Sequence, residues 1–293
     1  MLFGMARIAI IGGGNIGEAL LSGLLRAGRQ VKDLVVAERL PDRVTYLADT
    51  YSVLVTSVRE AVDNATFVVV AVKPADVESA MGDLVNAAAE SDGAEQVFVT
   101  VAAGITITYF ESKLPAGTPV IRAMPNAAAL VGAGVTALAK GRYVTPQQLE
   151  EVSALFDAVG GVLTVPETQM DAVTALSGSG PAYFFLLVEA LVDAGVAVGL
   201  SRDVAAELTA QTMAGSAAML LERMGQERRP VDGEAFGPWV DSSASQLRAS
   251  VTSPGGTTAA ALRELERGGF RAAVDAAVQA AKTRSEQLRI TSE

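Results

Sequence analysis

The segment "ARIAIIGGGNIGEALLSGLLRAG", residues 6–28, constrains the fold more than any other part of the chain. An apolar run typical of a buried strand is followed by a stretch with the apolar spacing of an amphipathic helix. Between them, Gly12, Gly14 and Gly17 form the pattern G-x-G-x-x-G. In such a turn the first glycine allows a tight bend, the second lets the backbone approach a pyrophosphate, and the third packs the helix on the strand. The segment therefore predicts a dinucleotide-binding turn; a purely structural turn is the alternative.

Strands and helices alternate over the first part of the chain. Short runs that are apolar on both faces are typical of buried parallel strands covered by helices, as in a doubly wound α/β sheet. The expected strands are residues 7–11, 33–37, 52–56, 66–72, 96–102, 119–124, 134–138 and 161–165. We therefore expect a Rossmann-like domain over residues 1–164.

From residue 165 onward, Ala- and Leu-rich segments at helical spacing replace the strand pattern. The stretch 224–243, rich in Gly, Pro and charged residues, predicts a loop of a length that is usually functional or disordered. The expected helices are residues 167–176, 180–199, 202–224, 241–250, 257–267 and 270–290. We expect residues 165–293 to form an all-α domain.

Composition excludes several kinds of chemistry. The 293 residues include no cysteine and no histidine. Disulfides, thiolate nucleophiles and Ser-His-Asp or Cys-His systems are therefore excluded, and we expect no metal site.

Charge and hydropathy limit the partners. The net charge of −10 argues against nucleic acid, because phosphate binding needs clustered Lys and Arg. The most apolar run, residues 181–200, carries Glu189 and Asp193, which favours a buried core helix over a membrane span. The N-terminal residues lack a basic leader and a cleavage site. We expect a cytoplasmic protein with no membrane partner.

Glu38 and Arg39 end the second expected strand. An acid at this position would accept a hydrogen bond from the ribose 2′-hydroxyl of NAD, whereas an arginine could hold the 2′-phosphate of NADP. A solvated strand end is the remaining alternative for both residues. The sequence thus leaves the cofactor preference open.

Three further motifs follow expected strands: "AVKP" at 71–74, "VAAG" at 101–104 and "RAMPN" at 122–126. Ligands bind outside the carboxyl ends of the strands in an open sheet. Small residues and proline there would let a flat nicotinamide lie against the backbone. Each motif alone is typical of an ordinary loop, but their combination favours a cofactor cleft.

Two motifs interrupt the helical region. In "ALSGSGPAYFF", residues 175–185, Ser and Pro are typical of a helix start, and the flanking glycines would allow a ligand or another chain to approach. The second motif is "TSPGGTT", residues 252–258, directly before the helical sequence "AAALRELE".

The second motif predicts an anion site. Thr257 or Thr258 is the expected N-cap, and the first turn has no acid, although helices usually place Asp or Glu there. Ser253, Gly256 and the two threonines would then offer hydroxyl and N–H groups to a substrate carboxylate, each such bond contributing roughly 1.5–3 kcal/mol. An ordinary turn between helices is the alternative.

Several blocks together carry a family resemblance. They are "IGGGNIGEAL", "AVKP", "VAAGIT", "VIRAMPN", "DAVTALSGSGPAYFF" and above all "LRASVTSPGGTTAAALRELE" followed by "GGFRAAVDAAVQAAKTRSEQL". Through them the chain resembles the pyrroline-5-carboxylate reductases over nearly its whole length. The resemblance implies NAD(P)H-dependent reduction of 1-pyrroline-5-carboxylate to L-proline, the final step of proline biosynthesis. It also implies a homodimer with interlocked helical domains, which in that family often assembles into a decamer.

The resemblance assigns roles to residues of this chain. Thr258 would be the catalytic residue, with its hydroxyl near the ring nitrogen, and Ser253, Gly256, Thr257 and Ser179 would join it in binding the substrate. The cofactor would be NADP, with NAD as the other possibility. The motifs and the resemblance together predict these cofactor-binding residues: Gly12, Gly14, Asn15, Ile16, Gly17, Glu38, Arg39, Ala71, Val72, Lys73, Pro74, Ala102, Ala103, Gly104, Met124 and Asn126.

Residue content agrees with an imine substrate. An enzyme that reduces a carbonyl must protonate an alkoxide, usually from His, Lys or Tyr. This chain has no His, and it has no Lys between Lys140 and Lys282, so the expected helical domain contains almost no strong proton donor. Tyr183 is the exception. A cyclic imine can arrive already protonated and needs only a neutral partner such as a threonine hydroxyl. Two alternatives are a two-domain hydroxyacid dehydrogenase, which would need a lysine in its second domain, and a non-catalytic dinucleotide-binding module.

Overall fold

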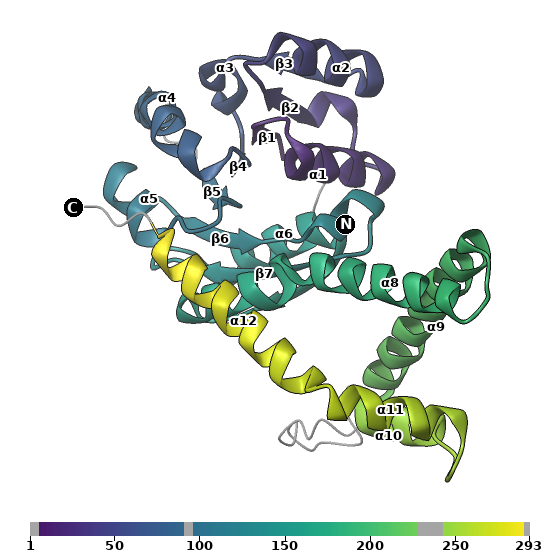
Figure 1. The fold of residues 1–293 in the computed structure, drawn as a ribbon. Helices are drawn as coiled ribbons and strands as arrows, with labels where there is room; N and C mark the ends of the chain where they lie inside the picture. Colours follow the sequence, from purple (N-terminus) through teal and green to yellow (C-terminus); the bar gives the residue numbers. More distant parts are fainter. Residues whose placement is uncertain (1–5, 91–95, 228–242, 290–293) are drawn as a thin grey trace. The chain divides into compact units, whose positions relative to one another are not determined.

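The computed structural model describes residues 6–90, 96–227 and 243–289 (Figure 1). Contacts divide the chain into two units. The first unit comprises Met1–Pro181 together with Val278–Glu293, and the second comprises Ala182–Ala277.

The first unit is built on an eight-stranded sheet in the order β3-β2-β1-β4-β5-β6-β7-β8. The order 3-2-1-4-5-6 of the first six strands is that of a Rossmann fold. Each strand overlaps an expected one, which confirms the α/β class. The strands are β1 (Ile8–Ile11), β2 (Leu34–Ala37), β3 (Leu54–Thr56), β4 (Phe67–Val70), β5 (Val97–Thr100), β6 (Val120–Met124), β7 (Gly134–Lys140) and β8 (Gly160–Thr164).

One expectation about the sheet is wrong. The sequence predicts parallel strands throughout, but β6 and β7 are antiparallel, with Ile121 opposite Lys140. Only residues 125–133 connect these two strands. A parallel crossover needs a dozen or more residues, so this short connection reverses the chain direction. β8 then pairs parallel to β7.

Helices cover both faces of the sheet. In β1, Ile8 and Ile10 pack in one core cluster with apolar residues of α1, α2 and α6, while Ala9 and Ile11 belong to a second cluster with residues of α3, α4, α5 and α7. Alternate residues of a strand point to opposite faces, so both faces are buried and the runs read as continuously apolar. The helices of this unit are α1 (Asn15–Arg26), α2 (Pro41–Tyr51), α3 (Val58–Val62), α4 (Val77–Glu90), α5 (Ile107–Lys113), α6 (Pro146–Asp157) and α7 (Met170–Val173), with 3₁₀ turns η1 (Val31–Asp33), η2 (Pro74–Asp76), η3 (Ala127–Val131) and η4 (Glu167–Gln169).

The described part of the remaining chain is helical, as the sequence predicts. One difference is that α9 continues to Glu227, into the expected loop over 224–243; residues 228–242 of that loop lie outside the described residues. The helices are α8 (Gly180–Ala197), α9 (Arg202–Glu227), α10 (Ser243–Ser250), α11 (Thr257–Arg267) and α12 (Phe270–Gln287).

The boundary between the two units does not coincide with the end of the last strand. β8 ends at Thr164, but the described residues up to Pro181 and those at 278–289 belong to the same unit as the sheet. The division into domains at 164 and 165 therefore stays a prediction about which residues serve the cofactor and which the substrate.

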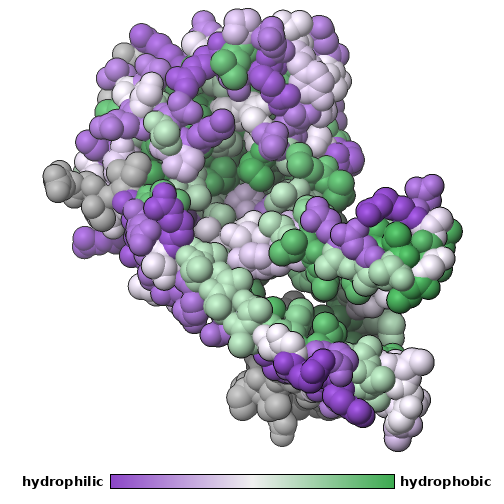
Figure 2. Space-filling model, in the orientation of Figure 1, coloured by the Kyte–Doolittle hydropathy of each residue, from purple (hydrophilic) through white to green (hydrophobic). Residues whose placement is uncertain are grey.

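The expectation of a buried core helix over residues 181–200 is wrong for the single chain. Phe184, Phe185 and Leu186 of α8 are 58–67% exposed. In the second unit, α8 and α9 form an apolar groove of about 580 Å³ that includes Leu191 and Leu208, and Figure 2 shows hydrophobic residues exposed along these two helices. By length and composition alone, the helical stretch Glu167–Ala197 would be long and apolar enough to cross a membrane, a test that helices of soluble proteins can also pass.

Candidate active site

A cleft of about 530 Å³ opens in the first unit at the carboxyl ends of β1, β2 and β4. β1 and β4 are the neighbours between which the strand order reverses, which is where open α/β sheets bind ligands. The cleft is lined by Ile11, Gly12, Gly14, Ala37, Glu38, Arg39, Leu40, Thr56, Ser57, Val58, Ala71, Val72, Lys73, Asp76, Ser79, Ala80 and Asp83. It thus contains Gly12, Gly14, Glu38, Arg39 and the 71–73 segment among the predicted cofactor-binding residues.

The glycine-rich turn fits a dinucleotide. Gly12 has φ +105°, and a Cβ there would lie 2.8 Å from the carbonyl oxygen of Ala71, while a Cβ on Gly17 would collide with the Gly12 carbonyl. Gly14 lines the cleft, and a Cβ there would meet nothing within 4 Å of the protein. A side chain at Gly14 would therefore occupy the space in front of the helix. Gly14 is also the N-cap of α1 and provides no side-chain cap, so the N-terminal N–H groups of α1 suit a pyrophosphate.

The Glu38 carboxylate supports the same turn. Its Oε2 accepts a hydrogen bond from the Gly13 N–H at 2.9 Å. Its Oε1 accepts bonds from the N–H groups of Arg39 at 2.7 Å and Leu40 at 3.0 Å. Glu38 therefore lies at the end of β2, as predicted, and also ties the β2 end to the glycine-rich turn.

Arg43 of α2 holds the Gly13 peptide from its other side. Its Nε donates to the Gly13 carbonyl at 3.1 Å, and its guanidinium also pairs with Glu18 of α1 at 2.6 Å. Tyr46 and Tyr51 donate to Glu18 at 2.9 and 2.8 Å. Burial raises the pKa of Glu18, but the hydrogen bonds from Arg43 and the two tyrosines outweigh it, so the Glu18 pKa lies below its usual value. This cluster of Glu18, Arg43 and the two tyrosines holds the glycine-rich turn in place through the Gly13 carbonyl.

Sequence reasoning missed Arg43 and Asp76. Asp76 ends η2, lines the cleft and forms an ion pair with Arg39. The sequence could have indicated Asp76, because it lies two residues after "AVKP", directly before the start of a helix. Arg43 had no signal, because its position opposite Gly13 depends on how α2 packs.

Two other predicted cofactor-binding residues, Asn126 and Gly104, have contacts within the protein that give each of them a structural role. The Asn126 amide oxygen accepts a bond from the Val135 N–H at 3.2 Å and so braces the β6–β7 connection. Gly104 has φ +78°, and a Cβ there would lie 2.7 Å from the Leu288 carbonyl oxygen beyond the end of α12. Asn15, Ile16, Gly17, Pro74, Ala102, Ala103, Gly104, Met124 and Asn126 do not line the cleft, and their cofactor contacts stay predictions.

The predicted helix start before Pro181 has a different form. Residues Thr174–Gly178 make a π-helical turn that leads into α8, and the Ser179 N–H donates to the Thr174 carbonyl at 2.9 Å. Proline lacks an N–H, and a π-type turn absorbs the interruption without ending the helix. A Cβ on Gly178 would lie 2.7 Å from Cε of Met124, so the "SGSG" segment packs against the end of β6.

The turn before α11 lies in the second unit. Gly256 is the N-cap, which corrects the expectation of Thr257 or Thr258, and both threonines stand in the first helical turn. The Gly256 N–H donates to the Ser253 carbonyl at 3.0 Å, which closes the turn. Among the described residues no side chain caps α11. The first turn of α11 carries no acid, as predicted. The helix start is therefore open to an anion.

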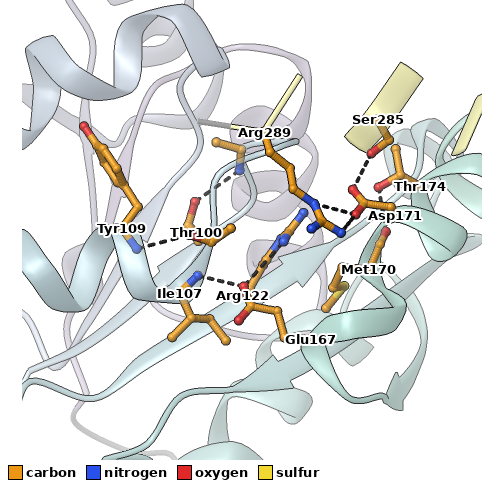
Figure 3. Close-up of polar contacts among 12 residues, drawn as sticks. Thr100, Ile107, Tyr109, Arg122, Glu167, Met170, Asp171, Thr174, Ser285 and Arg289 are labelled. Carbon is orange, nitrogen blue, oxygen red and sulfur yellow. Dashed lines mark hydrogen bonds and ion pairs between the residues drawn. The ribbon is translucent and has the colours of Figure 1, made fainter. Parts of the chain in front are cut away.

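A buried polar network joins the C-terminal residues to the sheet (Figure 3). Asp171 accepts hydrogen bonds from Ser285 of α12 and from Nε of Arg289, each at 2.7 Å. Burial raises the pKa of Asp171, but the bonds from Arg289 and Ser285 and the charge of Arg122 place it below its usual value. Arg122 pairs with Glu167 at 3.4 Å, and Glu167 accepts the Ile107 N–H at 2.7 Å. The network fastens the end of α12 near the "VAAG" turn, which Gly104 lets it approach.

Comparisons with known proteins decide the family. The family model described as "Pyrroline-5-carboxylate reductase dimerisation" matches residues 167–288, and that described as "NADP oxidoreductase coenzyme F420-dependent" matches residues 7–104. The chain is 84% identical over 295 residues to the pyrroline-5-carboxylate reductase of Mycobacterium tuberculosis, covering 100% of both. The chain belongs to the pyrroline-5-carboxylate reductase family.

Solved structures of pyrroline-5-carboxylate reductases share the fold. The Coxiella burnetii enzyme is 34% identical, with a TM-score of 0.85 over 98% of this chain and 100% of that chain. A Plasmodium falciparum pyrroline carboxylate reductase, solved with NADP bound, is 27% identical, with a TM-score of 0.78 over 97% of this chain and 99% of that one.

Proposed function

We propose that the protein reduces 1-pyrroline-5-carboxylate to L-proline with hydride from NADPH or NADH, in the cytoplasm, as the final step of proline biosynthesis. The observation that carries the proposal is 84% identity over the full chain to a reductase of that name. An open cleft with the glycine-rich turn at its base supports it.

The cleft residues would hold the dinucleotide. The backbone at Gly12 and Gly14 and the N-terminus of α1 would hold the pyrophosphate, and Glu38 and Arg39 would contact the ribose. The cofactor supplies the hydride, and the protein holds it in place through these contacts.

The start of α11 would bind the substrate carboxylate. Ser253 lies in the turn before the helix, Thr257 and Thr258 stand in its first turn, and that turn carries no acid. The Thr258 hydroxyl would accept a hydrogen bond from the protonated ring nitrogen. Because the imine arrives with its proton, the chain needs no strong acid, and catalysis depends on positioning the acceptor carbon.

A second copy of the chain would complete the assembly. The exposed apolar groove of α8 and α9 lies within the region that matches the reductase dimerisation family. We propose a homodimer with interlocked helical domains, each site drawing on both chains, and further assembly into a decamer.

Oxidation of the nicotinamide cofactor tests the activity. Purified protein is mixed with pyrroline-5-carboxylate and with NADPH or NADH in turn, and absorbance at 340 nm is followed. Turnover that depends on the imine, with proline as product, is expected with at least one cofactor. Dinucleotide binding without turnover would instead support a non-catalytic binding module. Turnover with a 2-oxo acid, and not with the imine, would support a hydroxyacid dehydrogenase.

Replacing the Thr258 hydroxyl tests its proposed role. In Thr258→Ala, kcat should fall by about 10- to 100-fold, because a single hydrogen bond to a charged group is removed, while dinucleotide binding should not change. Thr258→Ser is the matched control, because it keeps the hydroxyl and restores most of the rate. Equal rates in wild type and Thr258→Ala would reject the role.

A further inference from the structure

The outer end of the cleft combines one arginine with three acids. Glu38 and Arg39 follow β2, Asp76 ends η2, and Asp83 lies on α4 along the same wall. This is the end at which a Rossmann cleft distinguishes a ribose 2′-hydroxyl from a 2′-phosphate. The arrangement of these charges therefore bears on the choice between NADH and NADPH.

The Glu38 carboxylate already accepts three hydrogen bonds and can accept one more from a hydroxyl. A carboxylate offers about four acceptor positions. Oε1 accepts the N–H groups of Arg39 and Leu40, and Oε2 accepts that of Gly13. The remaining position on Oε2 can accept a ribose 2′-hydroxyl, whereas a 2′-phosphate there would be repelled.

Arg39 is already engaged in the structure. Its guanidinium pairs with Asp76, and the two side chains are 68% and 35% exposed. The pair lies in the cleft wall, so it can open without unfolding. While it is closed, Asp76 neutralises the cation that a 2′-phosphate would need and adds a negative charge beside it.

We propose that Asp76 is a specificity-determining residue: by holding Arg39, it shifts the preference of the cleft from NADPH toward NADH. The inference rests on the proposed function, because it assumes that a dinucleotide occupies this cleft. Loss of the Asp76 charge frees Arg39 to pair with the phosphate and removes a repulsive group at the same time.

Equilibrium binding tests this without turnover. Dissociation constants for NAD⁺ and NADP⁺ are measured by titration calorimetry on the full chain and on Asp76→Asn, which keeps side-chain size. We expect the ratio of the NADP⁺ to the NAD⁺ dissociation constant to fall about three- to tenfold, the modest range reflecting solvent screening of an exposed pair. An unchanged ratio would overturn the proposal. A rise would show that Asp76 instead orients Arg39 for the phosphate, and would overturn it equally.

Two further variants distinguish the effect of the Arg39–Asp76 ion pair from the effect of negative charge in the cleft as a whole. Asp83→Asn removes an acid of the same cleft about 10 Å further along the helical wall and should shift the ratio much less. In the double variant Asp76→Asn with Arg39→Gln, most of the gain for NADP⁺ should disappear, because the freed cation is absent and only the loss of repulsion is left. An equal gain in Asp83→Asn, or a gain that survives undiminished in the double variant, would contradict the role of Arg39.

The outcomes remain distinguishable from those of the proposed function. If neither dinucleotide binds the wild-type chain, the proposed function fails. If both bind and the ratio does not respond to Asp76→Asn, the selectivity role alone fails.

Discussion

At the scale of single residues, each of the three glycines in the G-x-G-x-x-G motif is required for a different physical reason. Gly12 needs its positive φ and its closeness to Ala71, and Gly17 needs the absence of a Cβ against Gly12. A Cβ at Gly14 would have no protein atom within 4 Å. Glycine is needed there because a side chain would fill the space that a ligand would occupy. The start of α11 is similar, since it lacks both a side-chain cap and an acid of its own.

An acid placed at that helix start tests for a bound carboxylate. Ala260 is exposed one turn into α11, where Asp would itself favour the helix dipole and leave the fold intact. In Ala260→Asp, KM for pyrroline-5-carboxylate should rise about tenfold through repulsion, with a smaller change in kcat, because carboxylate binding acts on ground and transition states alike. Steady-state kinetics measures this. Ala260→Asn is the neutral control, and an unaltered KM in Ala260→Asp would show that no anion lies there.

At the scale of elements, the buried network around Asp171 joins α7, α12 and β6. Asp171 is 2% exposed and Arg122 3% exposed, so these charges depend on one another for stability. They secure the residues beyond α12 against the "VAAG" turn, whose Gly104 lies against Leu288. A segment from the far end of the chain therefore supports a turn that follows β5.

Removing the Asp171 charge should destabilise the first unit in a pH-dependent way. At pH 7, Asp171→Asn should lower the free energy of unfolding by about 1–3 kcal/mol, because Arg289 and Ser285 lose a charged acceptor. The folded pKa of Asp171 is lowered, so its stabilisation is complete above the ordinary Asp pKa of about 3.9 and is lost as pH falls through the folded value. Urea unfolding of both proteins from pH 7 to pH 3 should show the difference shrinking with acidification.

Variants on α12 provide the comparison for this prediction. Ser285→Ala removes one bond to Asp171 and should destabilise less than Asp171→Asn. Thr283→Ala, two residues away and exposed, should change stability by less than about 0.5 kcal/mol. A pH-independent loss in Asp171→Asn would show that shape rather than charge matters at this position.

At the scale of the whole molecule, the single chain leaves much apolar surface uncovered. α8 exposes Phe184, Phe185 and Leu186, and the groove between α8 and α9 is lined almost entirely by apolar and small residues (Figure 2). Contiguous apolar surface of this kind is typical of a surface that a protein, a membrane or a ligand covers. A second copy is the partner that the family suggests.

A charge in the groove should dissociate the oligomer. Leu191 is 50% exposed in the single chain, and Leu191→Glu should weaken association by about 100-fold or more, because a carboxylate would be buried without a partner. Size-exclusion chromatography with light scattering should show smaller species that still bind dinucleotide but turn over slowly. Leu54→Glu, at a position 58% exposed on β3 of the first unit, is the matched control and should leave the size unchanged. An unchanged size in Leu191→Glu would exclude the groove from the interface.

The sequence by itself determined the eight strands, the helices, the glycine-rich turn and the open start of α11. These follow from local periodicity, from backbone conformations that only glycine adopts readily, and from residue types in one helical turn. Only the tertiary structure decided the reversed direction of β7, the ion pair of Arg39 with Asp76, the bond from Arg43 to Gly13 and the attachment of α12 to Asp171. Each of these joins residues far apart in the chain or depends on how a connection closes in space. Local patterns fix which element forms, whereas packing fixes which side chains meet.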